Sequence, residues 1–192
     1  GRMCGQLVKE AMPEGGSVII LVGRLGQENA RLRRQGVIDE LLDRSHDRTR
    51  YDDPNDGEVK GKTYTILDTR TDGFDHGKCK NNAQDAIAKY EGLGCMVGLF
   101  AYNPPLILEA VREAGKVGKI KIVSFDEDAR SLQAIKDGAM HGTTVQNPYA
   151  YGHKSVEILA ALARGDKSII PEGGVINVPA RNIRKDNVDE FW

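Results

Sequence analysis

The amino-acid sequence predicts an α/β fold in which a parallel sheet carries helices on both faces. Three observations lead to this prediction. Short runs of apolar residues alternate along the chain with longer segments whose apolar residues recur at helical spacing. Most connections between them are short, and glycine or proline marks several boundaries. Continuous apolar runs are typical of strands covered on both faces, and strand–helix alternation with short connections favours parallel strands joined through helices.

The first half of the chain contains three predicted helices and three predicted strands. Apolar residues at helical spacing predict helices over residues 3–12, 30–43 and 75–90. Short apolar runs predict strands over residues 17–22, 63–67 and 94–100. Residues 45–62 are polar, charged and rich in Asp, Arg and Gly, which predicts an exposed loop that is unusually long for this fold.

The second half continues the same alternation. We predict strands over residues 120–125, 142–146 and 175–178. Helices are expected over residues 104–114, 129–137 and 148–164. Pro104 and Pro105 lie in the first turn of a helix, where the missing N–H groups cost little. Gly115 and Gly165 follow helices, as glycine commonly does.

Length and charge exclude several classes of protein. The 192 residues are enough for one sizeable α/β domain, and the net charge is −1. This balance provides no broad attraction to nucleic acid or to an anionic membrane. No apolar run approaches the roughly 18 residues that would span a bilayer. The start, Gly1-Arg2-Met3, runs directly into amphipathic sequence without a signal peptide, so we interpret it as a cut or processed end.

A polar or aromatic side chain stands near the carboxyl end of each of five predicted strands. In chain order these residues are Arg33, Phe74, Asn103, Asp126 and Gln146. The carboxyl ends of parallel strands share one sheet edge, where ligands bind in open α/β folds. Carboxylate, guanidinium and amide groups exchange hydrogen bonds with hydroxyls, and an aromatic ring packs on C–H faces. The set therefore predicts a site for a small, hydroxyl-rich molecule such as a sugar.

Each of these residues taken alone has another explanation. Arg31, Arg33 and Arg34 can be solvated or paired on a helix surface, and Phe74 can be a core residue. Asn103 and Asp126 can each cap the helix that follows. Gln146 alone is an uninformative loop residue. The interpretation as a site depends on all five residues falling at successive strand ends.

The segments that carry these residues follow a recognisable order. Ala30-Arg-Leu-Arg-Arg-Gln-Gly36 matches the pattern A-R-x-R-x-x-G, and Val123-Ser-Phe-Asp126 is close to V-G-F-D. Residues 72–75, Ala101-Tyr-Asn103 and Thr144-Val-Gln146 follow at nearly constant spacing. From about residue 1 to about residue 180, this order resembles bacterial periplasmic sugar-binding proteins of the ribose-binding type, a fold shared with lac-type repressor effector cores. The resemblance implies that Arg33, Phe74, Asn103, Asp126 and Gln146 bind the sugar.

The resemblance also implies a division of the chain. Residues 1–146 would form the C-terminal sugar-binding lobe, a Rossmann-like three-layer α/β/α unit. Residues 147–171 would be a return helix that belongs to the N-terminal lobe, and residues 172–192 a crossing strand and C-terminal tail. The sequence departs from the family in its long loop over residues 45–62 and in Pro104-Pro105, which replace an acidic pair. The resemblance further implies that the family's first lobe, of about 100 residues, would precede Gly1 in the whole protein.

The function implied by the resemblance is sugar transport. The protein would be the solute-binding component of an ABC-type transporter, a monomer in the periplasm or lipid-anchored outside the inner membrane. It would bind a monosaccharide between two lobes, close at hinges near Gln146-Asn147 and over residues 171–175, and dock on a membrane permease or a sensor. Under this interpretation it is not an enzyme, requires no cofactor or metal, and has no nucleic-acid partner.

Two alternatives remain at this stage. The first is the effector-binding core of a lac-type transcription regulator without its DNA-binding headpiece, which only sequence upstream of Gly1 would distinguish. The tail over residues 182–192 resembles the C-termini of transport proteins and favours transport. The second is an α/β enzyme, for which His76 and Cys79 share a helix face. No orienting carboxylate accompanies this pair, so we expect a solvent-facing Cys79, whereas Cys4 and Cys95 are expected to be small core residues.

Overall fold

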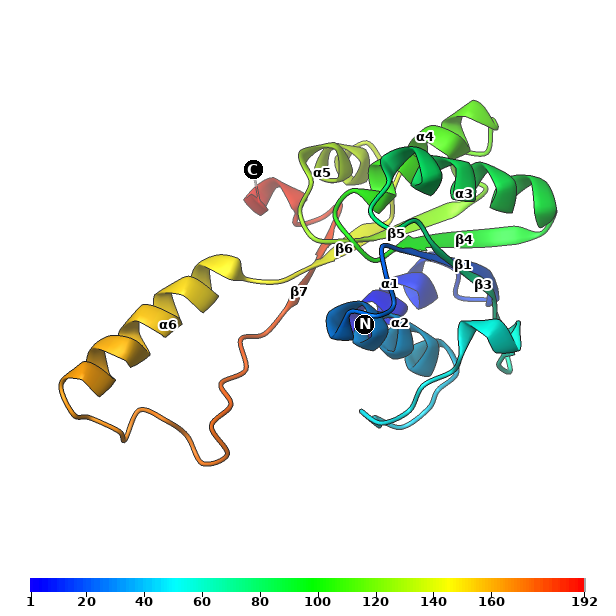
Figure 1. Ribbon diagram of the computed structural model, residues 1–192. Coiled ribbons are helices and arrows are strands. Elements are labelled where there is room, and N and C mark those ends of the chain that lie inside the picture. Colours follow the sequence, from blue (N-terminus) through cyan, green and yellow to red (C-terminus); the bar gives the residue numbers. More distant parts are fainter. Residues whose placement is uncertain (192) are drawn as a thin grey trace. The chain divides into compact units, whose positions relative to one another are not determined.

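The computed structural model describes residues 1–191, and the chain divides into two compact units. The first, here called the sheet unit, comprises Gly1–Thr144 together with the chain from Asn182 onward. The second, here called the helical unit, comprises Val145–Arg181. Figure 1 shows both units with most of their helices and strands labelled.

Seven strands form one sheet in the order β2-β3-β1-β4-β5-β6-β7. Their bounds are β1 Gly16–Val22, β2 Val59–Lys60, β3 Tyr64–Thr71, β4 Leu93–Gly98, β5 Lys121–Phe125, β6 Gly142–Val145 and β7 Arg181–Arg184. The pairs β1–β3, β1–β4, β4–β5 and β5–β6 are parallel, whereas β2 is antiparallel to its neighbour β3. The predicted parallel α/β sheet is therefore confirmed.

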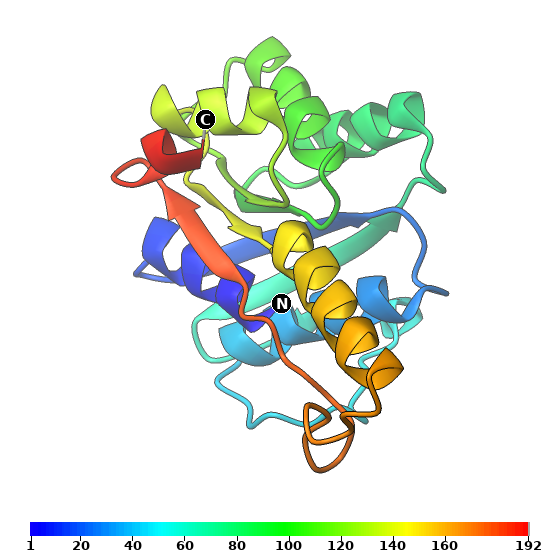
Figure 2. The same ribbon diagram turned by 90° about the vertical axis from the view of Figure 1, so that its left-hand side faces the viewer.

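Helices cover both faces of this sheet, as predicted. They are α1 Arg2–Ala11, α2 Glu28–Leu41, α3 His76–Lys89, α4 Asn103–Glu113 and α5 Ala129–Lys136. Figure 1 shows α1 and α2 on one face and α3, α4 and α5 on the other. The same separation is visible from the side in Figure 2. A 3₁₀ turn, η2 Val188–Phe191, ends the described chain.

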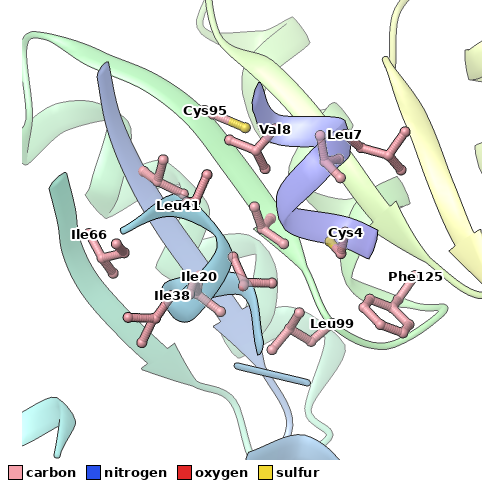
Figure 3. Close-up of a cluster of buried hydrophobic side chains, with 14 of the residues drawn as sticks. Cys4, Leu7, Val8, Ile20, Ile38, Leu41, Ile66, Cys95, Leu99 and Phe125 are labelled. Atoms are coloured by element: carbon pink, nitrogen blue, oxygen red, sulfur yellow. The ribbon is translucent and has the colours of Figure 1, made fainter. Parts of the chain in front are cut away.

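The centre of the sheet explains why β1 is an uninterrupted apolar run. Val18, Ile19, Ile20, Leu21 and Val22 are all fully buried because β3 and β4 flank the strand and helices cover both faces. A core cluster fills the space between the sheet and the helices α1 and α2, and Figure 3 shows fourteen of its side chains. This packing holds the loops at the carboxyl edge of the sheet in fixed positions.

Two predicted elements differ from the structure. The loop over residues 45–62 contains a 3₁₀ turn, η1 Pro54–Asp56, and the short strand β2. It is held against α2 because the amide of Gln35 donates to Asp52 Oδ2 at 2.6 Å and accepts from Asp52 N at 2.9 Å. The strand predicted over residues 175–178 is wrong: the described strand is β7, whose Ile183 is buried, whereas Val175 is 67% exposed.

The helical unit contains one long helix, α6 Pro148–Ala163, as predicted. Asn147 caps it by accepting a hydrogen bond from Ala150 N at 3.0 Å. Of the residues in this helix, only Ala161 is buried, and Tyr149, Val156 and Leu159 are exposed apolar side chains. Over the described residues 1–191, no helix is long and apolar enough to cross a membrane.

Candidate functional site

Four of the five predicted site residues belong to the sheet unit. Arg33 lies on α2, Phe74 follows β3, Asn103 opens α4 after β4, and Asp126 directly follows β5. Phe74 and Asp126 therefore lie in loops at the carboxyl edge of the sheet, and Asn103 begins a helix there, where open α/β folds bind ligands. The fifth predicted residue, Gln146, belongs to the helical unit and is exposed.

Arg33 is buried and held from several sides. Its Nη1 donates to the backbone oxygen of Leu99 at 2.7 Å and to Asp126 Oδ2 at 3.2 Å. The guanidinium carbon lies 4.4 Å from the ring centre of Phe125 and 5.4 Å from that of Phe100. Burial of a charge is costly unless it is paired, and here a carboxylate and two aromatic faces surround it. The alternative of a solvated surface arginine is therefore wrong for Arg33, although Arg31 is exposed.

Asp126 is the partner of Arg33 and remains open to solvent. Its side chain is 27% exposed, and its backbone has a left-handed φ of 63°. Two backbone bonds fix this turn: Asp126 N donates to Thr144 O at 2.9 Å, and Asp126 O accepts from Thr143 Oγ1 at 2.8 Å. Asp128, not Asp126, caps the following helix by accepting from Arg130 N. The cap alternative for Asp126 is wrong, and its carboxylate is available to a ligand.

Phe74 presents an exposed ring next to this pair. The side chain is 39% exposed, which excludes the alternative of a core residue. Its φ of 72° is unusual for a bulky residue, and such strain persists only where the surroundings hold it. The ring packs against Gly23, where an added Cβ would lie only 2.3 Å from the Phe74 ring atom Cε1. It also meets Phe100 edge-on, at 5.6 Å between ring centroids.

Asn103 is fully buried, and its amide is turned inward. Oδ1 accepts from Phe100 N at 3.0 Å, while Nδ2 donates to Asp72 Oδ2 at 2.9 Å and to Cys79 Sγ at 3.2 Å. The bond to Phe100 N reaches a residue before the helix, and the N-cap position of α4 is Tyr102. Capping therefore does not account for Asn103. Its two amide hydrogens are both used within the protein.

Sequence reasoning missed Asp72 and Tyr102. Asp72 is buried and accepts hydrogen bonds from Phe74 N at 2.8 Å, from the Tyr102 hydroxyl and from Asn103. Burial, together with the hydrogen bond to the Asp72 carboxylate, raises the pKa of Tyr102 above its usual value, so this hydroxyl stays a donor. An acidic residue two positions before the aromatic residue was visible in the sequence, but its partners were not.

Phe100 joins these groups into one patch. It lies under the Arg33 guanidinium, meets the Phe74 ring, and stacks on Tyr102 at 6.3 Å between ring centroids. The structure thus joins buried Arg33, partly exposed Asp126 and the exposed Phe74 ring through Phe100, and Asn103 lies fully buried next to Phe100. The patch offers a hydrogen-bond donor (Arg33) and a hydrogen-bond acceptor (Asp126) beside the flat apolar ring of Phe74. A small hydroxylated ligand requires this combination.

The expectation of a solvent-facing Cys79 is wrong. Cys79 is fully buried beneath Asn103, because its helix face packs inward, and burial raises the pKa of its thiol to about 12. His76 is exposed and stacks on Tyr102 at 5.0 Å between ring centroids. The two residues therefore form no nucleophile pair. Within residues 1–191, no three His, Cys, Asp or Glu side chains are grouped so that they could hold a metal ion.

We expect all three cysteines to be unreactive in the folded protein. Cys4 and Cys95 are buried, as predicted, and burial raises the pKa of Cys4 to about 12 and that of Cys95 still further above its usual value. Because the thiolate is the nucleophile, a disulfide reagent at pH 8 should modify no cysteine in native protein and all three in urea. A thiol that reacts within seconds under native conditions would contradict this burial.

Comparison with known proteins gives a consistent result. Residues 1–167 match the family model described as periplasmic binding protein domain. The chain is 26% identical over 169 residues to the ribose import binding protein RbsB of Salmonella typhimurium, covering 87% of this chain and 50% of the relative. It is 27% identical over 188 residues to the xylitol-binding protein of Mycolicibacterium smegmatis, and the match covers 96% of this chain and 47% of the relative. The chain thus spans about half the length of these curated relatives.

Solved structures show the same fold. The glucose-galactose binding protein GanP of Geobacillus stearothermophilus superimposes with a TM-score of 0.81 at 20% identity, over 97% of this chain and 59% of that one. A periplasmic solute binding protein of Actinobacillus succinogenes with bound D-allose superimposes with a TM-score of 0.82 at 18% identity, over 99% of this chain and 59% of that one. Since the family model matches most of the sequence, this chain belongs to the periplasmic binding protein domain family, in the group that resembles the ribose-binding proteins.

Proposed function

We propose that this chain is part of the solute-binding component of an ABC-type sugar transporter, which binds a monosaccharide and does not transform it. The observation that carries the proposal is the patch in which the Arg33–Asp126 pair adjoins the exposed Phe74 ring. Its relatives include proteins named for the binding of ribose, xylitol and D-allose, which supports a small sugar or polyol as the ligand class.

Each group of the patch has a role in this proposal. Asp126 accepts hydrogen bonds from two neighbouring sugar hydroxyls, and the Arg33 guanidinium donates to sugar oxygens while it holds Asp126 in place. Phe74 packs on the C–H face of the sugar ring. Gln146 adds an amide at the crossing between the lobes. These groups bind and orient a ligand, and none of them is arranged as a nucleophile with a base.

The proposed division of the chain rests on the exposed apolar side chains of α6. Residues 1–146 would be one sugar-binding lobe, residues 147–171 a return helix that packs on the N-terminal lobe of the same protein, and residues 172–192 the crossing and tail. Tyr149, Val156 and Leu159 would then be covered by that lobe. Gly173 and Gly174 both have positive φ, which suits the second hinge over residues 171–175.

The proposed partner is the membrane permease, and the proposed state is a periplasmic or lipid-anchored monomer. Ligand would close the two lobes because the closed form contacts both faces of the sugar. The relatives named as import and binding proteins favour this assignment over a regulator of the lac type.

A thermal-shift screen of the full-length protein tests the proposal. D-ribose, D-allose, D-galactose and xylitol would each be added at increasing concentration, and one of them should raise the melting temperature with concentration because it binds only the native state. The 192-residue chain, titrated in a calorimeter with the same compound, should bind much more weakly because it spans only about half the length of its sugar-binding relatives. No shift with any of the four compounds, or equally tight binding by the 192-residue chain, would contradict the proposal.

A further inference from the structure

The buried carboxylate of Asp72 is the least expected feature near the patch. It is 2% exposed and accepts three hydrogen bonds, from Phe74 N, the Tyr102 hydroxyl and Asn103 Nδ2. Among the described residues, no lysine, arginine or histidine forms an ion pair with it. Neutral donors alone therefore satisfy this buried carboxyl group, whose burial would otherwise be costly.

Two of these bonds act directly on predicted ligand residues. The bond to Phe74 N stabilises the backbone of Phe74 at a φ of 72°, a value that phenylalanine otherwise avoids. The bond to Asn103 Nδ2, together with those to Cys79 Sγ and from Phe100 N, turns the whole amide away from the surface. The Asp72 carboxylate thus holds the Phe74 ring at the surface and keeps the Asn103 amide in the interior.

From this geometry we infer that Asp72 is a positioning residue of the ligand site and that Asn103 supports the site from behind instead of contacting the sugar. The inference rests on the proposed sugar-binding function and refines which residues form the site. At this corner the ligand meets the ring of Phe74 and the outer edge of Tyr102. Asn103, for which the sequence predicts a ligand contact, acts through Asp72.

The substitution Asp72→Asn should disrupt this arrangement for a definite reason. The new amide has one acceptor oxygen and one donor nitrogen, whereas three donors converge at this position. If its nitrogen faces Asn103, two amide donors oppose each other; if it faces Phe74, the backbone N–H loses its acceptor. We expect sugar affinity to fall at least about tenfold, because a buried donor left unpaired is costly in either orientation.

The exchanged pair Asp72→Asn with Asn103→Asp separates positioning from contact. The new amide at position 72 would accept from Phe74 N and Tyr102 with its oxygen and donate with its nitrogen to the new carboxylate at position 103. That carboxylate would also accept from Phe100 N and from the Cys79 thiol, so Phe74 N, the Tyr102 hydroxyl and Phe100 N each regain an acceptor. We expect the exchanged variant to bind sugar within about threefold of the wild type. If Asn103 donated to the sugar, the exchange would replace a donor by a carboxylate and affinity would stay low.

The experiment is a calorimetric titration of the full-length protein with whichever of D-ribose, D-allose, D-galactose and xylitol gives the largest thermal shift. Asp85→Asn, the same chemical change at an exposed position of α3, is the matched control and should bind like the wild type. Wild-type affinity in Asp72→Asn, or no recovery in the exchanged variant, overturns the inference and leaves the proposed function intact. If Asp72→Asn is too unstable to purify, the exchanged variant alone decides. Absence of binding by the wild type would reject the proposed function itself.

Discussion

Arg33→Ala and Asp126→Ala are each expected to abolish the sugar-dependent rise in melting temperature of the full-length protein. Arg33→Ala removes a guanidinium that is buried between two aromatic rings and donates hydrogen bonds to Leu99 O and Asp126. Asp126→Ala removes the partly exposed carboxylate that would accept hydrogen bonds from sugar hydroxyls. A hydrogen bond between a charged side chain and the sugar contributes about 1.5–3 kcal/mol, so its loss lowers affinity by at least about tenfold.

The same substitutions also lower the stability of the unliganded protein, so the readout must separate the two effects. Removal of Asp126 leaves Arg33 as a buried charge without a carboxylate partner, which destabilises the fold whether or not sugar binds. The relevant quantity is therefore the difference in melting temperature with and without sugar for each variant. Arg31→Ala and Glu127→Ala, at exposed neighbouring positions, are the matched controls. A normal sugar response in both Arg33→Ala and Asp126→Ala would show that the site is elsewhere.

Ile20→Ala should cause the largest loss of stability, about 2–5 kcal/mol in the free energy of unfolding. Ile20 is fully buried in the middle of β1, with Thr69 of β3 on one side and Val97 of β4 on the other. Because the strands on both sides are fixed by their own hydrogen bonds, the surroundings have little freedom to close the cavity. Urea denaturation of the wild type and the variant measures the difference.

Two further variants set the scale for this measurement. Ile20→Val removes a single methylene group and should cost about 0.5–1.5 kcal/mol. Val117→Ala, at a position that is 45% exposed, should stay within about 0.5 kcal/mol of the wild type. A loss at Ile20→Ala no greater than that at Val117→Ala would mean that the core around β1 is not packed as described.

Most of the fold follows from the sequence because its pattern is locally consistent. The buried run of β1 and the glycine and proline residues at element boundaries are enough to predict parallel strands and their covering helices. The strand predicted over residues 175–178 failed because apolar composition alone does not provide a partner strand. Cys79 was misplaced because helical spacing identifies a face without saying which way that face points.

The candidate site was predictable in outline but not in its hydrogen bonding. Strand ends are visible in a sequence, so the grouping of Arg33, Phe74, Asn103 and Asp126 could be expected. The inward rotation of the Asn103 amide could not, because it depends on Asp72, which is 31 positions away along the chain. Contacts between distant residues that reorient a side chain have no local pattern to reveal them.

The two-residue strand β2 has a consequence for behaviour in concentrated solution. It occupies the outer side of β3 by pairing with Thr65 and Ile66, and it carries Lys60 at the rim. An uncovered outermost strand recruits strands from neighbouring molecules, whereas a very short, charged one gives them little to extend. The long connection after α2 thereby protects the molecule against edge-to-edge aggregation, a role quite separate from ligand capture.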